Sequence, residues 1–161
     1  ESTVVTIGKI NGGYNFNVIA DKVNLKGTTR AYTEKNRMLI KKRMNELLKG
    51  IGNAFNAKIT LDYKDGYPPV INNNDCSLKL LASAKKVVGD GAGAPYLSMG
   101  GEDFSYFINE IPGCFFFIGS SPKNRKPLST PHHCSHFDID EEALLIGTNT
   151  FIQLIEDLLI K

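Results

Sequence analysis

The stretch Asp65-Gly66-Tyr67-Pro68-Pro69 constrains the fold most, because it interrupts the secondary-structure pattern of the first part of the chain. Glycine and proline at this density end helices and strands alike. We therefore expect a domain boundary here, with one domain over residues 1–66 and a second over residues 67–161. A chain of 161 residues can fill one sizeable core or two small ones, so its length permits this division.

The part before this break has the pattern strand–strand–helix–strand. Polar and apolar side chains alternate weakly over residues 3–10 and again over residues 16–32, with the turn signal Asn11-Gly12-Gly13 between them. Apolar residues then recur with a helical period over residues 34–55, and alternation returns over residues 57–63. This pattern predicts an antiparallel sheet with one polar face and one face buried by the helix.

The part after the break has the pattern of an α/β domain. Amphipathic periodicity and helix-start signals predict helices over residues 75–88, 102–110 and 141–160. The run Cys114-Phe115-Phe116-Phe117-Ile118 is apolar on both faces, which is typical of a buried strand in a parallel sheet. A long polar loop follows this run, and long loops in compact domains are often functional.

Charge and cysteine content limit the class of protein. The 19 basic and 17 acidic residues give a net charge of +2, which argues against a nucleic-acid or membrane-surface binder. No apolar run approaches the roughly 20 residues of a membrane-spanning helix. Cys76, Cys114 and Cys134 form no C-x-x-C pair, and their odd number predicts a reducing, cytoplasmic setting. The sequence opens without Met on a strand-like run, which predicts a piece of a longer protein.

All three histidines lie within one short stretch, ahead of the last predicted helix. His132, His133 and His136 fall in the sequence Pro131-His132-His133-Cys134-Ser135-His136. Histidine is the commonest transition-metal ligand, so the cluster indicates either a metal site or polar surface histidines. Adjacent side chains of an extended segment point to opposite sides, so His132 and His133 rarely bind one ion together.

Three further positions could contact a ligand. The pair Gly100-Gly101 precedes a predicted helix, where backbone N–H groups can approach a carboxylate, although a plain turn has the same sequence. Arg30 could pair with a carboxylate and Asn17 could donate to a developing oxyanion. Taken alone, an arginine on a strand is more typical of solvated surface. The sequence contains no phosphate-binding loop, dinucleotide motif or serine-nucleophile motif.

Three collinear stretches resemble one family. They are Gly12–Ala20 followed by Gly27–Arg30, then Ser98–Phe107, and then the residues around His133. Together they are similar to the aminoacylase and carboxypeptidase G superfamily (metallopeptidase clan MH), in its hippurate hydrolase, N-acyl-L-amino acid amidohydrolase and auxin-conjugate hydrolase branch. The resemblance implies an α/β protein. A partial ferredoxin-like lid, the dimerisation domain, would be followed by the C-terminal portion of a two-metal catalytic domain.

The resemblance also implies an activity and roles for five residues. Relatives hydrolyse the amide bond of N-acyl amino acids with a water that bridges two divalent ions, zinc or manganese first and cobalt or nickel as alternatives. His133 matches the last metal ligand. Asn17, near the scissile carbonyl, and Arg30, on the free carboxylate, match lid residues that contact substrate, usually across a homodimer. Gly100 and Gly101 match the loop that lines the substrate pocket.

The same resemblance places the remaining metal ligands and the general-base Glu upstream of this sequence. We therefore expect the chain alone to be inactive, because one histidine cannot hold two ions. Cys134-Ser135 stands where Ser-Pro is common after the ligand His, so a thiol would lie near the metal. Two alternatives stay open: a non-catalytic module for carboxylate binding or dimerisation, and a dipeptidase or N-acetyl-diaminopimelate deacetylase of the same superfamily.

Overall fold

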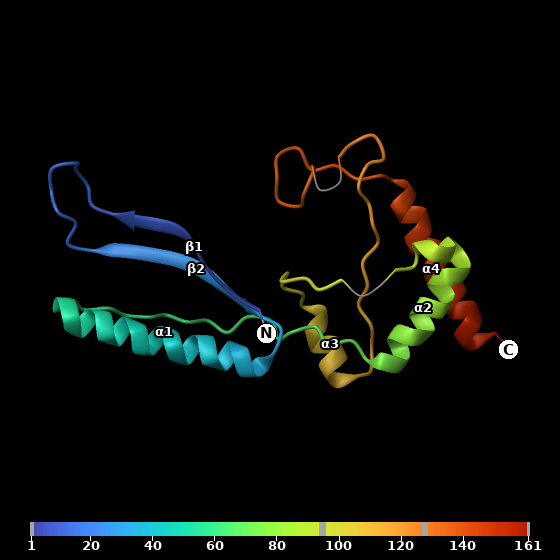
Figure 1. The fold of residues 1–161 in the computed structure, drawn as a ribbon, viewed down its shortest axis with the longest axis horizontal. Helices are drawn as coiled ribbons and strands as arrows, with labels where there is room; N and C mark the ends of the chain where they lie inside the picture. Colours follow the sequence, from blue (N-terminus) through green and yellow to red (C-terminus); the bar gives the residue numbers. More distant parts are fainter. Residues whose placement is uncertain (1, 94–95, 127–128, 161) are drawn as a thin grey trace. The chain divides into compact units, whose positions relative to one another are not determined.

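The computed structural model describes residues 2–93, 96–126 and 129–160, and Figure 1 shows the course of the chain. The chain divides into two compact units. The first contains the residues up to Val70 together with Ser98–Tyr106, and the second contains Ile71–Leu97 and the residues from Phe107 on. The fold is mixed α/β, as the sequence predicts. The division into a lid domain over residues 1–66 and a catalytic domain over residues 67–161 stays a prediction.

An antiparallel hairpin opens the first unit. Strand β1 (Thr3–Gly12) pairs with β2 (Val23–Ala31), in a register that runs from Thr3 opposite Ala31 to Gly12 opposite Val23. The prediction that the second strand starts at residue 16 is wrong, because residues 13–22 form the connecting loop. In this loop Gly13 has a φ of +76°, and the Asn15 side chain accepts a hydrogen bond of 2.9 Å from the Phe16 N–H. Such local side-chain bonds compete with strand pairing.

Helix α1 (Glu34–Phe55) follows the hairpin and contacts β2. The Thr33 hydroxyl caps its first turn by accepting from the Asn36 N–H, and Asn56 ends it in the left-handed conformation with a φ of 50°. The sequence predicts that one side of β2 is buried, but this side is covered only at the C-terminal end of the strand. Thr29 and Ala31 are half-buried there, whereas Val23 and Leu25 are 50% and 57% exposed.

The strand predicted over residues 57–63 is also wrong. The segment is extended, but the sheet among the described residues has only β1 and β2, and this segment pairs with neither. It is held instead by the Ala57 N–H, which donates to the Gly52 carbonyl at 2.9 Å, and by a hydrogen bond between the side-chain hydroxyls of Tyr63 and Thr29. Alternation sets an extended backbone, but a strand also requires a neighbour whose backbone groups it can pair with.

Two helices form the centre of the second unit. Helix α2 (Asn74–Val88), which continues into the 3₁₀ turn η1 (Gly89–Gly91), packs against α4 (Glu142–Leu159). The small residue Gly147 makes room on α4, because a Cβ there would lie 2.7 Å from Cδ1 of Ile118. The shorter helix α3 (Phe104–Glu110) begins two residues later than the sequence predicts.

The run Cys114–Ile118 is extended but is not the buried strand that its apolar character predicts. The Asn72 side chain takes the place of a neighbouring strand: its amide donates to the Phe115 carbonyl at 2.7 Å and accepts from the Phe115 N–H at 2.8 Å. On one side Phe116 packs on Phe151 of α4, with ring centroids 5.5 Å apart. On the other side Phe117 packs edge-on against Tyr96 but is still 55% exposed, so that face of the run is only partly covered.

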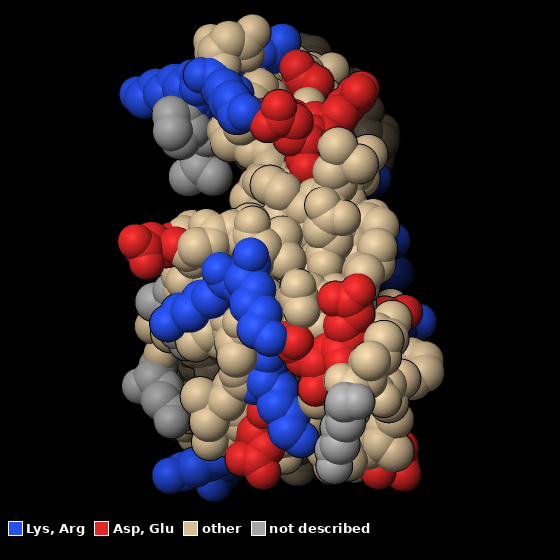
Figure 2. All heavy atoms as spheres, turned by 90° about the vertical axis from the view of Figure 1, so that its right-hand side faces the viewer, with Lys and Arg blue, Asp and Glu red and all other residues tan. Residues whose placement is uncertain are grey.

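None of the helices in the described part of the chain has the length and apolarity that crossing a bilayer requires. Positive and negative side chains lie next to one another on the face shown in Figure 2, with an uncharged area between the groups. This distribution agrees with the nearly balanced charge of the sequence.

A polar network ties α2 to α4. Asp157 accepts hydrogen bonds from Lys86 at 2.5 Å, from the Ser83 hydroxyl at 2.7 Å and from Gln153 at 3.0 Å. The Ser83 side chain is almost fully buried, so this bond satisfies a polar group that water does not reach. The bond from Lys86, and after it the bond from Ser83, lowers the pKa of Asp157 below its ordinary value of 3.8.

The lowered pKa predicts acid-sensitive helix packing. The ionised carboxylate stabilises the fold above the unfolded pKa, and this contribution is lost as pH falls through the folded pKa. We expect Asp157→Asn to lower the thermal midpoint near pH 7 and to reduce its dependence on pH down to about pH 3. Asp21→Asn is a matched control, because Asp21 makes no ion pair within the described ranges. Equal pH profiles for wild type and Asp157→Asn would contradict this role of the network.

Candidate functional site

Arg30 lies near the end of β2, in the first unit. It is opposite Val4 in the register, its side chain is exposed, and its Nη1 donates to the Thr29 carbonyl at 3.1 Å. Within the described residues the guanidinium makes no ion pair with an acidic side chain. The remaining donors of its planar fork therefore face solvent, where they could bind a carboxylate in bidentate geometry.

The loop that joins β1 to β2, visible in Figure 1, contains Asn17 and lies at the opposite end of the hairpin from Arg30. The side chains around it are unusually exposed for their type: Tyr14 is 83% exposed, Phe16 99% and Ile19 96%. The loop thus presents an amide beside a group of apolar side chains that the first unit itself does not cover.

The hairpin does not bring Asn17 and Arg30 together. Seven residue steps separate Val23, where β2 begins, from Arg30. At about 3.3 Å per residue this is about 23 Å along the strand, and Asn17 lies before Val23 in the loop. A small acylated amino acid is much shorter than this distance, so one such molecule cannot contact both side chains of the same chain.

Gly100 and Gly101 also lie in the first unit, just before α3, whose first three residues belong to that unit as well. The Gly100 N–H donates to the Ser98 hydroxyl at 3.0 Å, so a ligand would have to compete with Ser98 for this donor. A Cβ on Gly101 would lie 3.5 Å from the ring of Tyr67, which in turn packs edge-on against Tyr106 at 5.9 Å between centroids. The glycine pair therefore forms a turn that packs beside two tyrosines.

His133 lies in the second unit with a φ of +64°. It and Asn56 are the non-glycine residues in the described ranges with positive φ. The left-handed conformation costs an L-residue about 1–2 kcal/mol, so the surrounding loop must hold it in place. Two hydrogen bonds do so: the Thr130 hydroxyl donates to the Asp138 carbonyl at 3.2 Å, and the Phe137 N–H donates to the Cys134 carbonyl at 3.2 Å.

The structure separates the roles of the neighbouring histidines. The ring of His132 packs perpendicular to the ring of Phe137, with centroids 5.0 Å apart, which gives it a packing function. The rings of His132 and His133 lie 6.5 Å apart. The loop is further fixed by the ion pair of Arg125 with Asp138 at 3.2 Å. Of the three histidines, only His133 has a backbone in the left-handed conformation.

A complete metal centre is not formed by the residues that the structure describes. Among them, no three His, Cys, Asp or Glu side chains gather in a way that could hold an ion. His133 fits one position of a transition-metal site, because imidazole is a common ligand. Cys134 is free and partly buried beside it. Further ligands would have to come from another part of the protein.

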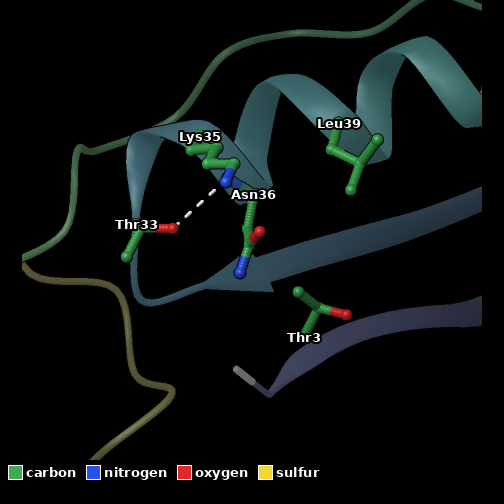
Figure 3. A pocket seen from close by; sticks show the side chains of 5 residues that line it. All are labelled: Thr3, Thr33, Lys35, Asn36 and Leu39. Atoms are coloured by element: carbon green, nitrogen blue, oxygen red, sulfur yellow. Dashed lines mark hydrogen bonds between the residues drawn. The ribbon is translucent and has the colours of Figure 1, made fainter.

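None of the five predicted site residues lines the hollow shown in Figure 3. It lies where α1 begins, next to the start of β1, and is lined by Thr3, Thr33, Lys35, Asn36 and Leu39. The bond from the Asn36 N–H to the Thr33 hydroxyl crosses its edge at 3.3 Å. The hollow lies at the capped first turn of α1 and contains no residue to which the sequence assigns a role in metal or substrate binding.

Two features of the site have no signal in the sequence. The left-handed backbone of His133 depends on the loop around it, and the hydrogen bond between Thr29 and Tyr63 joins residues 34 positions apart. Neither residue type nor spacing indicates such contacts.

Comparisons with known proteins place the chain in context. The family model for peptidase family M20/M25/M40 matches residues 3–157. The chain is 36% identical over 158 residues to IAA-amino acid hydrolase ILR1-like 4 of Arabidopsis thaliana, a match that covers 92% of this chain and 35% of that protein. It is 34% identical over 150 residues to the N-acetyldiaminopimelate deacetylase of Brevibacillus brevis, covering 91% of this chain and 38% of that protein.

A solved structure has the same fold. The Bacillus subtilis YXEP protein, described as a dinuclear metal binding peptidase from the M20 family, matches with a TM-score of 0.71 and 26% identity. The match covers 94% of this chain and 41% of that one. The chain spans little more than a third of the length of the curated relatives that it matches.

The backbone of His133 makes a prediction that is independent of catalysis. Glycine adopts positive φ without the Cβ clash, so in metal-free protein His133→Gly should be about 1 kcal/mol more stable than His133→Ala. At His136, whose φ is not positive, the order should reverse, because glycine only adds unfolded-state entropy. Urea unfolding of the four variants measures both differences. A His133→Ala protein more stable than His133→Gly would contradict the strain.

Proposed function

The chain belongs to peptidase family M20/M25/M40, and we propose that it forms the C-terminal part of a metal-dependent amidohydrolase that cleaves N-acyl amino acids. The observation that carries this proposal is the chemistry shared by its relatives. An IAA-amino acid hydrolase and several N-acetyldiaminopimelate deacetylases are each 32–36% identical to the chain over most of its length. Both names describe the release of an acyl group from the nitrogen of an amino acid.

In this proposal His133 is one ligand of a pair of divalent ions, zinc or manganese, with cobalt and nickel as alternatives. The remaining ligands come from residues that precede this sequence in the complete protein. Bound ions of this kind supply a water of lowered pKa as the nucleophile. The strained loop of His133 favours this role, because a protein holds a residue in a costly conformation where its position matters.

The other residues of the proposal bind and orient the substrate. Arg30 pairs with the free carboxylate of the amino acid through the donors that face solvent. The Asn17 amide donates a hydrogen bond to the scissile carbonyl oxygen, where negative charge develops during hydrolysis. Gly100 and Gly101 line the pocket, as a turn without side chains allows close approach.

The distance between Asn17 and Arg30 favours a homodimer. Because about 23 Å of strand lies between them, one substrate can reach both only if they belong to different chains. We propose that Arg30 acts within its own chain and that Asn17 reaches the site of a second copy. The exposed apolar residues of the Asn17 loop would then be covered by that copy.

N-acetyldiaminopimelate deacetylase is the second candidate activity. Five of the relatives bear this name, at 32–35% identity. The substrate of such an enzyme also has a free carboxylate next to the acylated nitrogen, so Arg30 would have the same role. A panel of N-acetyl, N-benzoyl and N-acetyldiaminopimelate substrates separates the two activities. The cytoplasmic location stays a prediction.

Arg30→Ala in the complete enzyme should act mainly on substrates with a free α-carboxylate. A charge-assisted pair is worth about 1.5–3 kcal/mol, so kcat/KM for N-acetyl amino acids should fall roughly 10- to 100-fold, while that for the corresponding amino acid amides changes little. Lys26→Ala, on the same side of β2, is the matched control. An equal loss on acids and amides in Arg30→Ala would count against the assignment.

Co-expression of two inactive variants tests the shared site. Asn17→Ala and Arg30→Ala chains should each be impaired as homodimers, but a mixed dimer contains one intact site. With random pairing about half of the dimers are mixed, so the activity should recover to about a quarter of the wild-type value. Activity no higher than that of either variant alone would mean that both residues of a site come from the same chain. The proposed arrangement would then be wrong.

A further inference from the structure

A partly buried polar contact lies next to Arg30 on β2. The hydroxyl oxygens of Thr29 and Tyr63 share a hydrogen bond of 2.6 Å and are partly buried. Thr29 precedes Arg30 on β2, and Tyr63 comes from the extended segment that does not pair with the sheet. The Tyr63 hydroxyl thus ties β2 to this segment at the strand end that carries Arg30.

Helix α1 holds Tyr63 from the other side. Lys41 places its ammonium 5.2 Å from the centroid of the Tyr63 ring and pairs with Asp65 at 2.6 Å. One turn earlier on the helix, Arg37 donates to the Gly66 carbonyl at 2.9 Å. Two side chains of α1 therefore fix the residues that follow the tyrosine, and Lys41 also lies over its ring, so that its hydroxyl has a defined position.

Arg30 is bound to the same residue that Tyr63 fixes. Neighbouring side chains on a strand point to opposite faces, so Thr29 faces Tyr63 while Arg30 faces solvent. The Arg30 Nη1 nevertheless reaches back to the Thr29 carbonyl at 3.1 Å. The position of the guanidinium depends on where this carbonyl lies, and the carbonyl depends on how Thr29 is held.

We propose that Tyr63 is a positioning residue: through Thr29 it fixes Arg30, and so it sets how tightly the enzyme holds the carboxylate of its substrate. The inference rests on the proposed function, in which Arg30 binds that carboxylate. In this role Tyr63 acts only through Arg30, without contact to the substrate or to a metal ion. Its removal therefore weakens carboxylate binding and leaves the chemical step unchanged.

The test uses the complete enzyme and three variants that differ by one or a few atoms. Tyr63→Phe removes the hydroxyl but keeps the ring beside Lys41, and Thr29→Val removes the other partner. Thr29→Ser keeps the hydroxyl and serves as the conservative rescue. A neutral hydrogen bond is worth about 0.5–1.5 kcal/mol. The KM for N-acetyl amino acids should therefore rise about threefold to tenfold in Tyr63→Phe and Thr29→Val, with kcat unchanged. Thr29→Ser should keep most of the wild-type affinity.

Two comparisons separate positioning from general stability. The KM for amino acid amides, which lack the carboxylate, should change little in any variant. In an Arg30→Ala background, Tyr63→Phe should have no further effect on KM, because the residue through which it acts is absent. A structural role alone would lower the thermal midpoint and raise KM for acids and amides alike.

Each failure has its own meaning. If Arg30→Ala discriminates between acids and amides but Tyr63→Phe does not, the positioning role is wrong and the proposed function stands. The same conclusion follows if the effect of Tyr63→Phe persists in the Arg30→Ala background. If Arg30→Ala itself does not discriminate, the role of Arg30 is wrong, and the inference falls with it.

Discussion

The pairing of β1 with β2 is the interaction on which the arrangement of the candidate site depends. The hairpin has little hydrophobic support, since Val5, Ile7, Ile10, Val23 and Leu25 are each 47–65% exposed. The backbone pairing from Thr3–Ala31 to Gly12–Val23, with one register shift between Ile7 and Lys9, therefore holds the two strands together, and α1 adds contacts with β2. The register holds Asn17 and Arg30 at opposite ends, and this separation favours a site shared between two chains.

Part of the fold follows from local sequence. The helical period and the helix-start signals predict α1 and α2 to within about two residues, because these signals are contained in the helix and its first turn. The segments 57–63 and 114–118 show the limit of such signals. Their patterns indicate an extended backbone, which the structure has, but a strand also needs a partner. Among the described residues Tyr63 and Asn72 supply side-chain contacts in place of one.

The sequence likewise predicts some features of the candidate site and not others. Residue type and the family resemblance indicate His133, Arg30 and Asn17, and the match to the M20/M25/M40 model confirms the family. The residue chemistry does not reveal that His133 has a left-handed backbone, or that Tyr63 stands behind Arg30. Both features arise from contacts between distant parts of the chain. Such contacts can fix the position of a side chain in a loop or at a strand end even where the neighbouring sequence gives no sign of it.

The central claim is that His133 is a ligand of a two-metal hydrolase, and metal content measured together with hydrolysis tests it most directly. The complete protein would be stripped with a chelator and reloaded with Mn²⁺ or Zn²⁺, as wild type and as His133→Ala, with His136→Ala as the control. We predict about two ions per wild-type chain. In His133→Ala we predict fewer ions and no hydrolysis of N-acetyl amino acids. Unchanged metal content and near-normal turnover in His133→Ala would contradict the account.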